Sequence, residues 1–143
     1  MGNNSNTLNL MYQIRFELDD LDAKTIYSDT PSEQNQYLIA ILKTYNAEFI
    51  SVYDAFAGYC QEAEMKGIEN YPLYNWTNSV LNEPEKVKKH KKNFTVHVEG
   101  DELYDKDVAN AIYQKLKSVD ICKKVTIHDT DPKNNPQMPK QYY

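Results

Sequence analysis

The feature that most restricts the fold of this chain is a change in the spacing of its apolar residues. Apolar and polar side chains alternate over residues 10–18, and they alternate again over 94–99. A two-residue period is typical of a strand with one buried face. Between these segments the apolar residues recur every three or four positions, as they do in amphipathic helices. The chain has 143 residues, the usual length of one domain. We therefore expect a single α+β domain over 10–130.

The first helical signals follow the N-terminal strand. Residues 30–33 (TPSE) form a capping-box pattern with a Thr cap, and they predict a helix over 31–45. Asn46 is expected to cap a second helix over 47–66. Gly67, which is followed by an apolar residue, is expected to end that helix.

The remaining parts of the N-terminal region have weaker patterns. Residues 23–28 follow an acidic turn and are expected to return as a short hairpin partner of the first strand. A third helix is predicted over 72–82, and it is followed by a Lys-rich linker over 82–93. Outside the domain we expect a flexible N-terminal arm over 1–9 and a Pro-rich C-terminal tail over 131–143.

The C-terminal part, 94–130, predicts a strand, a helix and a second strand, with Asp105 or Asp107 as the helix cap. This strand–helix–strand unit resembles half of a ferredoxin-like fold. Together with the strand and helices of 10–81, it predicts a small, mostly antiparallel sheet of about three or four strands, covered on one face by helices.

Charge and motif content restrict the function. The chain carries 16 basic and 21 acidic residues, a net charge of −5, and its only arginine is Arg15. This balance argues against a general nucleic-acid coat, which must neutralise phosphates. The sequence has no phosphate-binding glycine loop, no nucleophile elbow and no Cys/His zinc pattern. We therefore expect a non-enzymatic protein without a cofactor, and no membrane span.

The leading functional hypothesis is a protein–protein interface. Acidic and aromatic side chains are concentrated around the predicted turn and the second and third helices, and Tyr and Trp are favoured anchors of interfaces. We expect a regulator or inhibitor that binds a partner with a basic surface. The Lys and Asn usage is typical of AT-rich genomes and suggests a phage or mobile element. The expected partner-binding residues are Asp19, Asp20, Asp22, Glu62, Glu64, Glu69, Tyr71, Tyr74 and Trp76.

Two alternatives remain open. Residues 82–93 contain five lysines and two glutamates, a net charge of +3, and this segment is the candidate for a nucleic-acid-binding module. The tails suggest instead a structural subunit of a larger assembly, and a homo-oligomer is also compatible with the sequence. The lysines of the nucleic-acid alternative are Lys86, Lys88, Lys89, Lys91 and Lys92.

His97 and His128 are the only metal candidates, because each alternates with apolar residues on a predicted strand and both are expected on the polar face of the sheet. Cys60 and Cys122 are 62 positions apart and are expected to be reduced thiols. The N-terminus has no secretory signal pattern, so a cytoplasmic location is expected.

Overall fold

The computed structural model describes residues 11–26, 28 and 30–130. The N-terminal arm expected over 1–9 and the Pro-rich tail expected over 131–143 lie outside the described residues. Within them, four strands form one sheet in the order β2-β3-β1-β4, and every pair of neighbours is antiparallel. The strands are β1 (Tyr12–Glu17), β2 (Ala47–Ser51), β3 (Asn93–Val98) and β4 (Lys123–Asp129).

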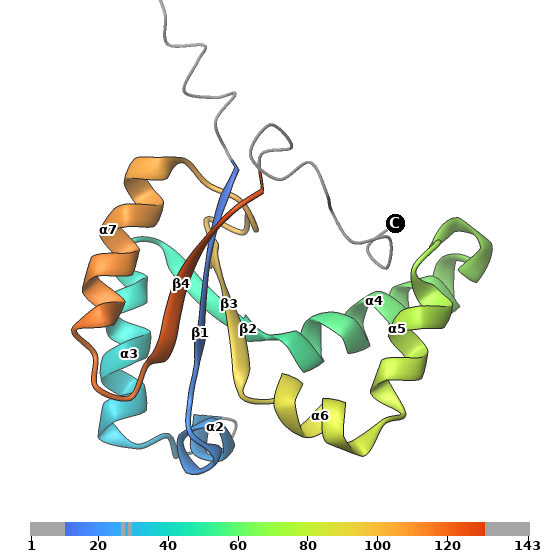
Figure 1. The fold of residues 1–143 in the computed structure, drawn as a ribbon, viewed down its shortest axis with the longest axis horizontal. Coiled ribbons are helices and arrows are strands. Elements are labelled where there is room, and N and C mark those ends of the chain that lie inside the picture. Colours follow the sequence, from blue (N-terminus) through green and yellow to red (C-terminus); the bar gives the residue numbers. More distant parts are fainter. Residues whose placement is uncertain (1–10, 27, 29, 131–143) are drawn as a thin grey trace, which may run out of the picture.

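Two helices connect strands that are not neighbours in the sheet. Helix α3 (Glu33–Lys43) lies between β1 and β2, and α7 (Lys106–Lys117) lies between β3 and β4. Both helices pack on the same face of the sheet (Figure 1). This strand order with two interleaved crossovers is the ferredoxin-like arrangement. The expected α+β class is therefore confirmed, and the ferredoxin-like topology extends over both halves of the chain.

The core lies between the sheet and these two helices. The ring of Phe16 stacks on Phe94 with centroids 5.5 Å apart, and Phe49 meets these two rings edge-on at 5.6 and 5.4 Å. Leu38 of α3 and Ile112 of α7 are both fully buried in the same cluster. Val125 of β4 belongs to the same cluster, so all four strands and both helices contribute to one continuous apolar core.

The opposite face of the sheet is polar. The register places Arg15 beside Thr95 on one side and Thr126 on the other. His128 lies next to Gln13, whose side chain accepts a hydrogen bond of 2.7 Å from Arg15 Nε. We refer to this surface as the open sheet face.

A helical insertion separates β2 from β3, two strands that follow each other directly in the simple ferredoxin-like plan. It projects from the end of the sheet toward the side away from α3 and α7 (Figure 1). The insertion comprises α4 (Val52–Lys66), the 3-10 turn η1 (Ile68–Asn70), α5 (Tyr74–Leu81) and α6 (Pro84–His90). The segment expected to be a Lys-rich linker is therefore mainly helix α6 and the turn after it.

The hairpin partner expected over 23–28 is wrong. The chain forms helix α2 (Asp20–Ile26) there, and the amide of Ala23 donates to the backbone oxygen of Asp19 at 2.8 Å. Asp20 and Asp22 lie in the first turn of α2, where carboxylates stabilise a helix through its dipole. Acidic residues interpreted as a turn signal are thus a helix start.

The helix expected over 47–66 begins five residues later. Asn46 has a φ of +55° and precedes strand β2, and the actual cap of α4 is Ser51, whose hydroxyl accepts from the Asp54 amide at 3.0 Å. Gly67 ends α4 as expected, with a φ of +109°.

The cap of the preceding helix was also placed too early. Ser32, not Thr30, caps α3, and its hydroxyl accepts from the Asn35 amide at 3.1 Å. In the C-terminal half the expectation is confirmed, because Asp105 caps α7 with a bond of 2.8 Å from the Val108 amide.

Candidate functional site

The far end of the helical insertion combines acidic, aromatic and apolar side chains. The last turns of α4, the turn η1 and the start of α5 meet there (Figure 1). We call this surface the insertion tip. Its residues are Glu62, Glu64, Met65, Ile68, Glu69, Tyr71 and Tyr74.

Two tyrosine–glutamate pairs fix the side chains of the insertion tip. The Tyr71 hydroxyl donates to Glu62 Oε2 at 2.8 Å, and the Tyr74 hydroxyl donates to Glu64 Oε2 at 2.7 Å. These hydrogen bonds to carboxylates raise the pKa of both tyrosines above its ordinary value. The Tyr59 ring supports Tyr71 edge-on at 5.4 Å. The aromatic rings are therefore held in one orientation, which lowers the entropy lost on binding.

The apolar part of the insertion tip is open to solvent. Met65 is 84% exposed and Ile68 is 49% exposed. Sequence reasoning missed both as functional residues, because Met65 falls outside the apolar stripe of its helix and Ile68 was interpreted only as the residue after a helix stop. A methionine between Glu64 and Lys66, on a charged helix face, was the available signal.

Trp76 has a different environment from the two tyrosines. Its ring meets Phe56 edge-on at 5.7 Å, while Phe56 in turn meets the His90 ring at 5.2 Å. This aromatic row joins α4, α5 and α6. The packing therefore gives Trp76 a role in holding the insertion together.

The acidic residues of the N-terminal region do not join the insertion tip. Asp20 and Asp22 belong to α2, at the base of the body, and Asp19 directly precedes it (Figure 1). The Asp20 carboxylate is paired with Lys92 Nζ at 3.3 Å. The nine residues expected to bind a partner are thus divided between two separate surfaces.

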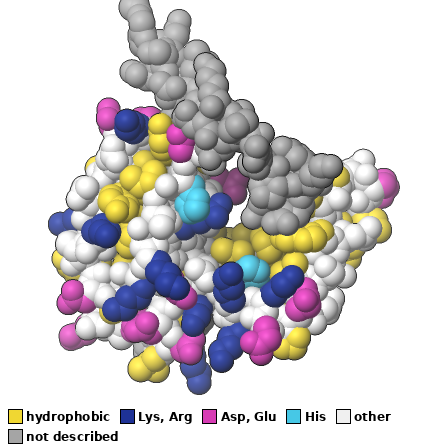
Figure 2. Space-filling view, viewed as in Figure 1, with side chains coloured by type: hydrophobic (Ala, Val, Ile, Leu, Met, Phe, Trp, Pro, Cys, Tyr) yellow, Lys and Arg dark blue, Asp and Glu magenta, His cyan; other side chains and the backbone are white. Residues whose placement is uncertain are grey.

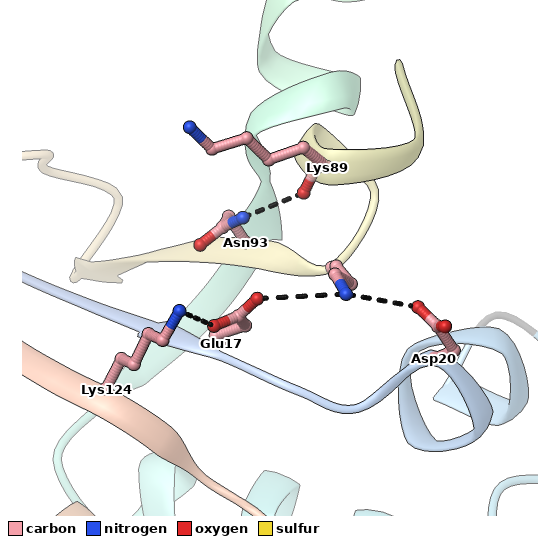
Figure 3. A network of polar contacts seen from close by, with 6 residues as sticks. Glu17, Asp20, Lys89, Asn93 and Lys124 are labelled. Carbon is pink, nitrogen blue, oxygen red and sulfur yellow. Dashed lines mark hydrogen bonds and ion pairs between the residues drawn. The ribbon is translucent and has the colours of Figure 1, made fainter. Parts of the chain in front are cut away.

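The lysine run is also divided. Lys86 pairs with Glu83 at 3.2 Å. Lys92 lies between Asp20 and Glu17, and Lys124 of β4 reaches the same Glu17 carboxylate at 3.2 Å (Figure 3). Basic side chains gather over α6 and the adjacent ends of the strands (Figure 2).

The other members of the run have different neighbours. The backbone oxygen of Lys89 accepts a hydrogen bond from the side-chain Nδ2 of Asn93 at 2.8 Å (Figure 3). Lys88 and Lys91 line a cavity together with Lys24. The lysines of α7, by contrast, belong to the helix layer that covers the sheet on the side opposite the open sheet face.

His97 and His128 both lie on the open sheet face, on strands that flank β1. His97 is opposite Glu48, and Nε2 of His128 is 3.1 Å from the Thr126 hydroxyl. Partial burial, with a smaller effect of Arg15, lowers the pKa of His128. Among the described residues, no group of three or more His, Cys, Asp or Glu side chains is placed to hold a metal ion.

Both cysteines are free thiols. Burial raises the pKa of Cys60, and it raises that of Cys122 to about 12 despite the neighbouring Lys123. Neither thiol is therefore activated as a nucleophile.

Comparison with known proteins gives no relative: no family model matches, and no curated protein or solved structure is significantly similar. In the part of the chain that the structure describes, no helix has the length and apolar character needed to cross a membrane. The assignment of a function therefore rests on the surfaces of the molecule itself.

Proposed function

We propose that the protein is a non-enzymatic binding module, a regulator or inhibitor, that docks its insertion tip on a basic surface of another protein. The observation that carries the proposal is the insertion tip itself, where Met65 and Ile68 are exposed on the same segment as two tyrosines that are hydrogen-bonded to Glu62 and Glu64. Rigid aromatic rings with adjacent apolar side chains are the usual anchors of protein interfaces.

Charge selects the partner. The insertion tip carries Glu62, Glu64 and Glu69, and Lys66 Nζ lies 3.7 Å from the Glu62 carboxylate. Exposed carboxylates speed encounter with a cationic surface more than they add affinity. The partner is therefore a protein with a basic patch. If that partner acts on nucleic acid, the insertion tip would compete with phosphates for the same patch.

Because the acidic residues lie on separate surfaces, the set of nine residues that the sequence predicts to bind a partner becomes smaller. Asp20 is neutralised by Lys92, and Trp76 packs within the insertion. The proposal therefore assigns the contact to the insertion tip, and not to Asp19, Asp20, Asp22 or Trp76.

The proposal keeps a cytoplasmic location, which the two free thiols support because disulfides are rare in reducing compartments. An origin in a phage or mobile element also stays part of the proposal, on composition alone.

The test has two steps. A photo-crosslinking amino acid at position 65 is introduced in the native host, and the same amino acid at position 21 serves as a control, because Leu21 is 71% exposed but lies in α2. The protein captured only from position 65 is then purified, and its affinity is measured for the wild type and for Tyr71→Ala/Tyr74→Ala. We expect the affinity to fall by at least about tenfold.

Tyr37→Ala is the matched control, because Tyr37 is 57% exposed on α3, far from the insertion. It is expected to bind the partner like the wild type. An unchanged affinity of Tyr71→Ala/Tyr74→Ala for the captured partner would overturn the proposal.

A further inference from the structure

A second surface of the molecule is basic, in contrast to the acidic insertion tip, and it forms a cavity. A cavity of about 480 Å³ opens between α2, α4 and α6. This volume falls within the range of small-molecule sites, about 300–1,000 Å³. The lining residues are Asp20, Ala23, Lys24, Tyr53, Asp54, Lys88, Lys91 and Lys92.

Two of the four lysines are held in place. Lys92 Nζ lies 3.3 Å from Asp20 and 3.9 Å from Glu17, and its side chain is only 28% exposed. Lys91 Nζ lies 4.8 Å from the centre of the Tyr53 ring, in a cation–π contact. Both ammonium groups are therefore positioned before any ligand arrives.

The other two lysines have unused charge. Lys24 and Lys88 form no ion pair with any residue of the described chain. Of the two carboxylates in the lining, Asp20 is already engaged by Lys92. Four lysines and two aspartates give the lining a net charge of +2.

This arrangement favours an anion. Ammonium groups that share one cavity repel each other, and the repulsion is relieved when an anion lies between them. The lysine stems, Ala23 and the Tyr53 ring supply the apolar part of the cavity walls. Lys binds phosphate oxygens as a point charge. Several ammonium groups around one cavity suit a ligand that carries more than one negative charge.

The geometry points to a binding site for a phosphate cluster, such as the diphosphate group of a nucleotide or neighbouring phosphates of a nucleic-acid strand. Lys24, Lys88 and Lys91 would contact the phosphate oxygens, while Lys92 is retained by its carboxylates. The site does not involve the insertion tip, so the two proposals fail or succeed independently.

The test follows backbone amide signals by NMR in about 150 mM salt, where exposed charges are screened. Inorganic pyrophosphate is the first probe, and a single-stranded thymidine 12-mer is the second. We expect saturable shifts at Tyr53, Lys88 and Lys91. The variant Lys88→Ala/Lys91→Ala is expected to weaken binding by about tenfold or more.

Lys106→Ala/Lys115→Ala is the matched control, because it removes the same charge from exposed positions on α7. It is expected to bind pyrophosphate like the wild type. Saturable pyrophosphate binding identifies a small-molecule source, and binding of the 12-mer alone, with the same dependence on Lys88 and Lys91, identifies a nucleic-acid source. Both results support the site.

Two results would overturn the inference. One is the absence of saturable shifts at Tyr53, Lys88 and Lys91 with either probe. The other is an equal loss of affinity in Lys88→Ala/Lys91→Ala and in the α7 control, which would show an effect of net charge only. Since both pairs of lysines are exposed, each variant is expected to fold, and its amide spectrum verifies this directly.

Discussion

Tyr104 shows how a single buried hydroxyl joins separate parts of the sheet. The side chain is 4% exposed, and its hydroxyl donates to the Val96 oxygen at 2.9 Å and accepts from the Ile14 amide at 2.7 Å. It thereby satisfies backbone groups of β1 and β3. Burial raises the pKa of Tyr104 to about 12, so the hydroxyl stays protonated at neutral pH.

The substitution Tyr104→Phe leaves both backbone groups without this partner. We expect the free energy of unfolding in urea to fall by about 1–3 kcal/mol. Tyr113→Phe is the control, because Tyr113 is partly buried and its ring, which is kept, makes the contact with Lys117 at 5.6 Å. Equal stability of the two variants would show that the Tyr104 hydroxyl contributes nothing.

Two glycines of the insertion differ in what they require. Gly67 ends α4 with a φ of +109°, and a Cβ there would come within 2.9 Å of Glu69 Oε1. Gly58 lies inside the same helix, and a Cβ there would meet nothing within 4 Å. The first glycine is needed for the backbone to turn into the insertion tip, and the second is not.

Opposite effects of alanine at the two positions are therefore expected. Gly67→Ala should lower the free energy of unfolding by about 1 kcal/mol or more, and Gly58→Ala should raise it by about 0.5–1 kcal/mol. Thermal and urea unfolding measure both. If Gly67→Ala were as stable as Gly58→Ala, the strained helix end would be disproved.

His90 makes the insertion sensitive to acid. Partial burial, followed by the charges of Lys89 and Lys86, lowers its pKa below the ordinary 6.5. The unfolded chain therefore takes up the proton first as the pH falls, so the stabilising effect is present above pH 6.5 and is lost below it. His128 on the open sheet face has a pKa lowered in the same direction by burial.

We expect the free energy of unfolding to depend on pH with different slopes in the wild type and in the variant. Between about pH 7.5 and pH 5, the wild type should lose more stability than His90→Gln/His128→Gln, because the variant lacks both titrating groups. Urea midpoints across this interval measure the loss. Parallel curves for the two proteins would contradict the assignment.

At the scale of elements, the misplaced boundary between β2 and α4 has a physical cause. Phe49, Tyr53 and Phe56 keep a helical spacing across the boundary between β2 and α4, although Phe49 packs in the sheet core and Phe56 in the insertion. Periodicity describes which residues are apolar and not which core they join. Where two cores meet, as at Ser51, the hydrogen bond of the cap decides the boundary.

At the scale of the molecule, the fold class followed from the sequence but the sites did not. The alternation of apolar and polar residues over 10–18 and 94–99 predicted a half-buried sheet. The lysine-lined cavity depends instead on contacts between residues that are distant in sequence, such as those of Glu17 with Lys92 and Lys124. No local pattern shows that a lysine run meets α2, so the cavity was not foreseen.

The body and the insertion also differ in how firmly they are packed. The main core joins all four strands with α3 and α7, whereas in the insertion only Cys60, Ala63, Thr77 and Val80 are buried within α4 and α5, and no residue of α6 is. Segments with few buried contacts open at lower free energy than the global transition. We therefore expect the insertion to open separately while the sheet stays folded.

Native-state hydrogen exchange tests this difference residue by residue. Amides of α5 should exchange with clearly lower protection than those of Ile14 in β1 and Val96 in β3, because both of these side chains are fully buried. Binding of a partner at the insertion tip would then raise protection in α4 and α5 selectively. Uniform protection across the sheet and the insertion would show instead that the molecule unfolds as one unit and that its binding surface is as rigid as its core.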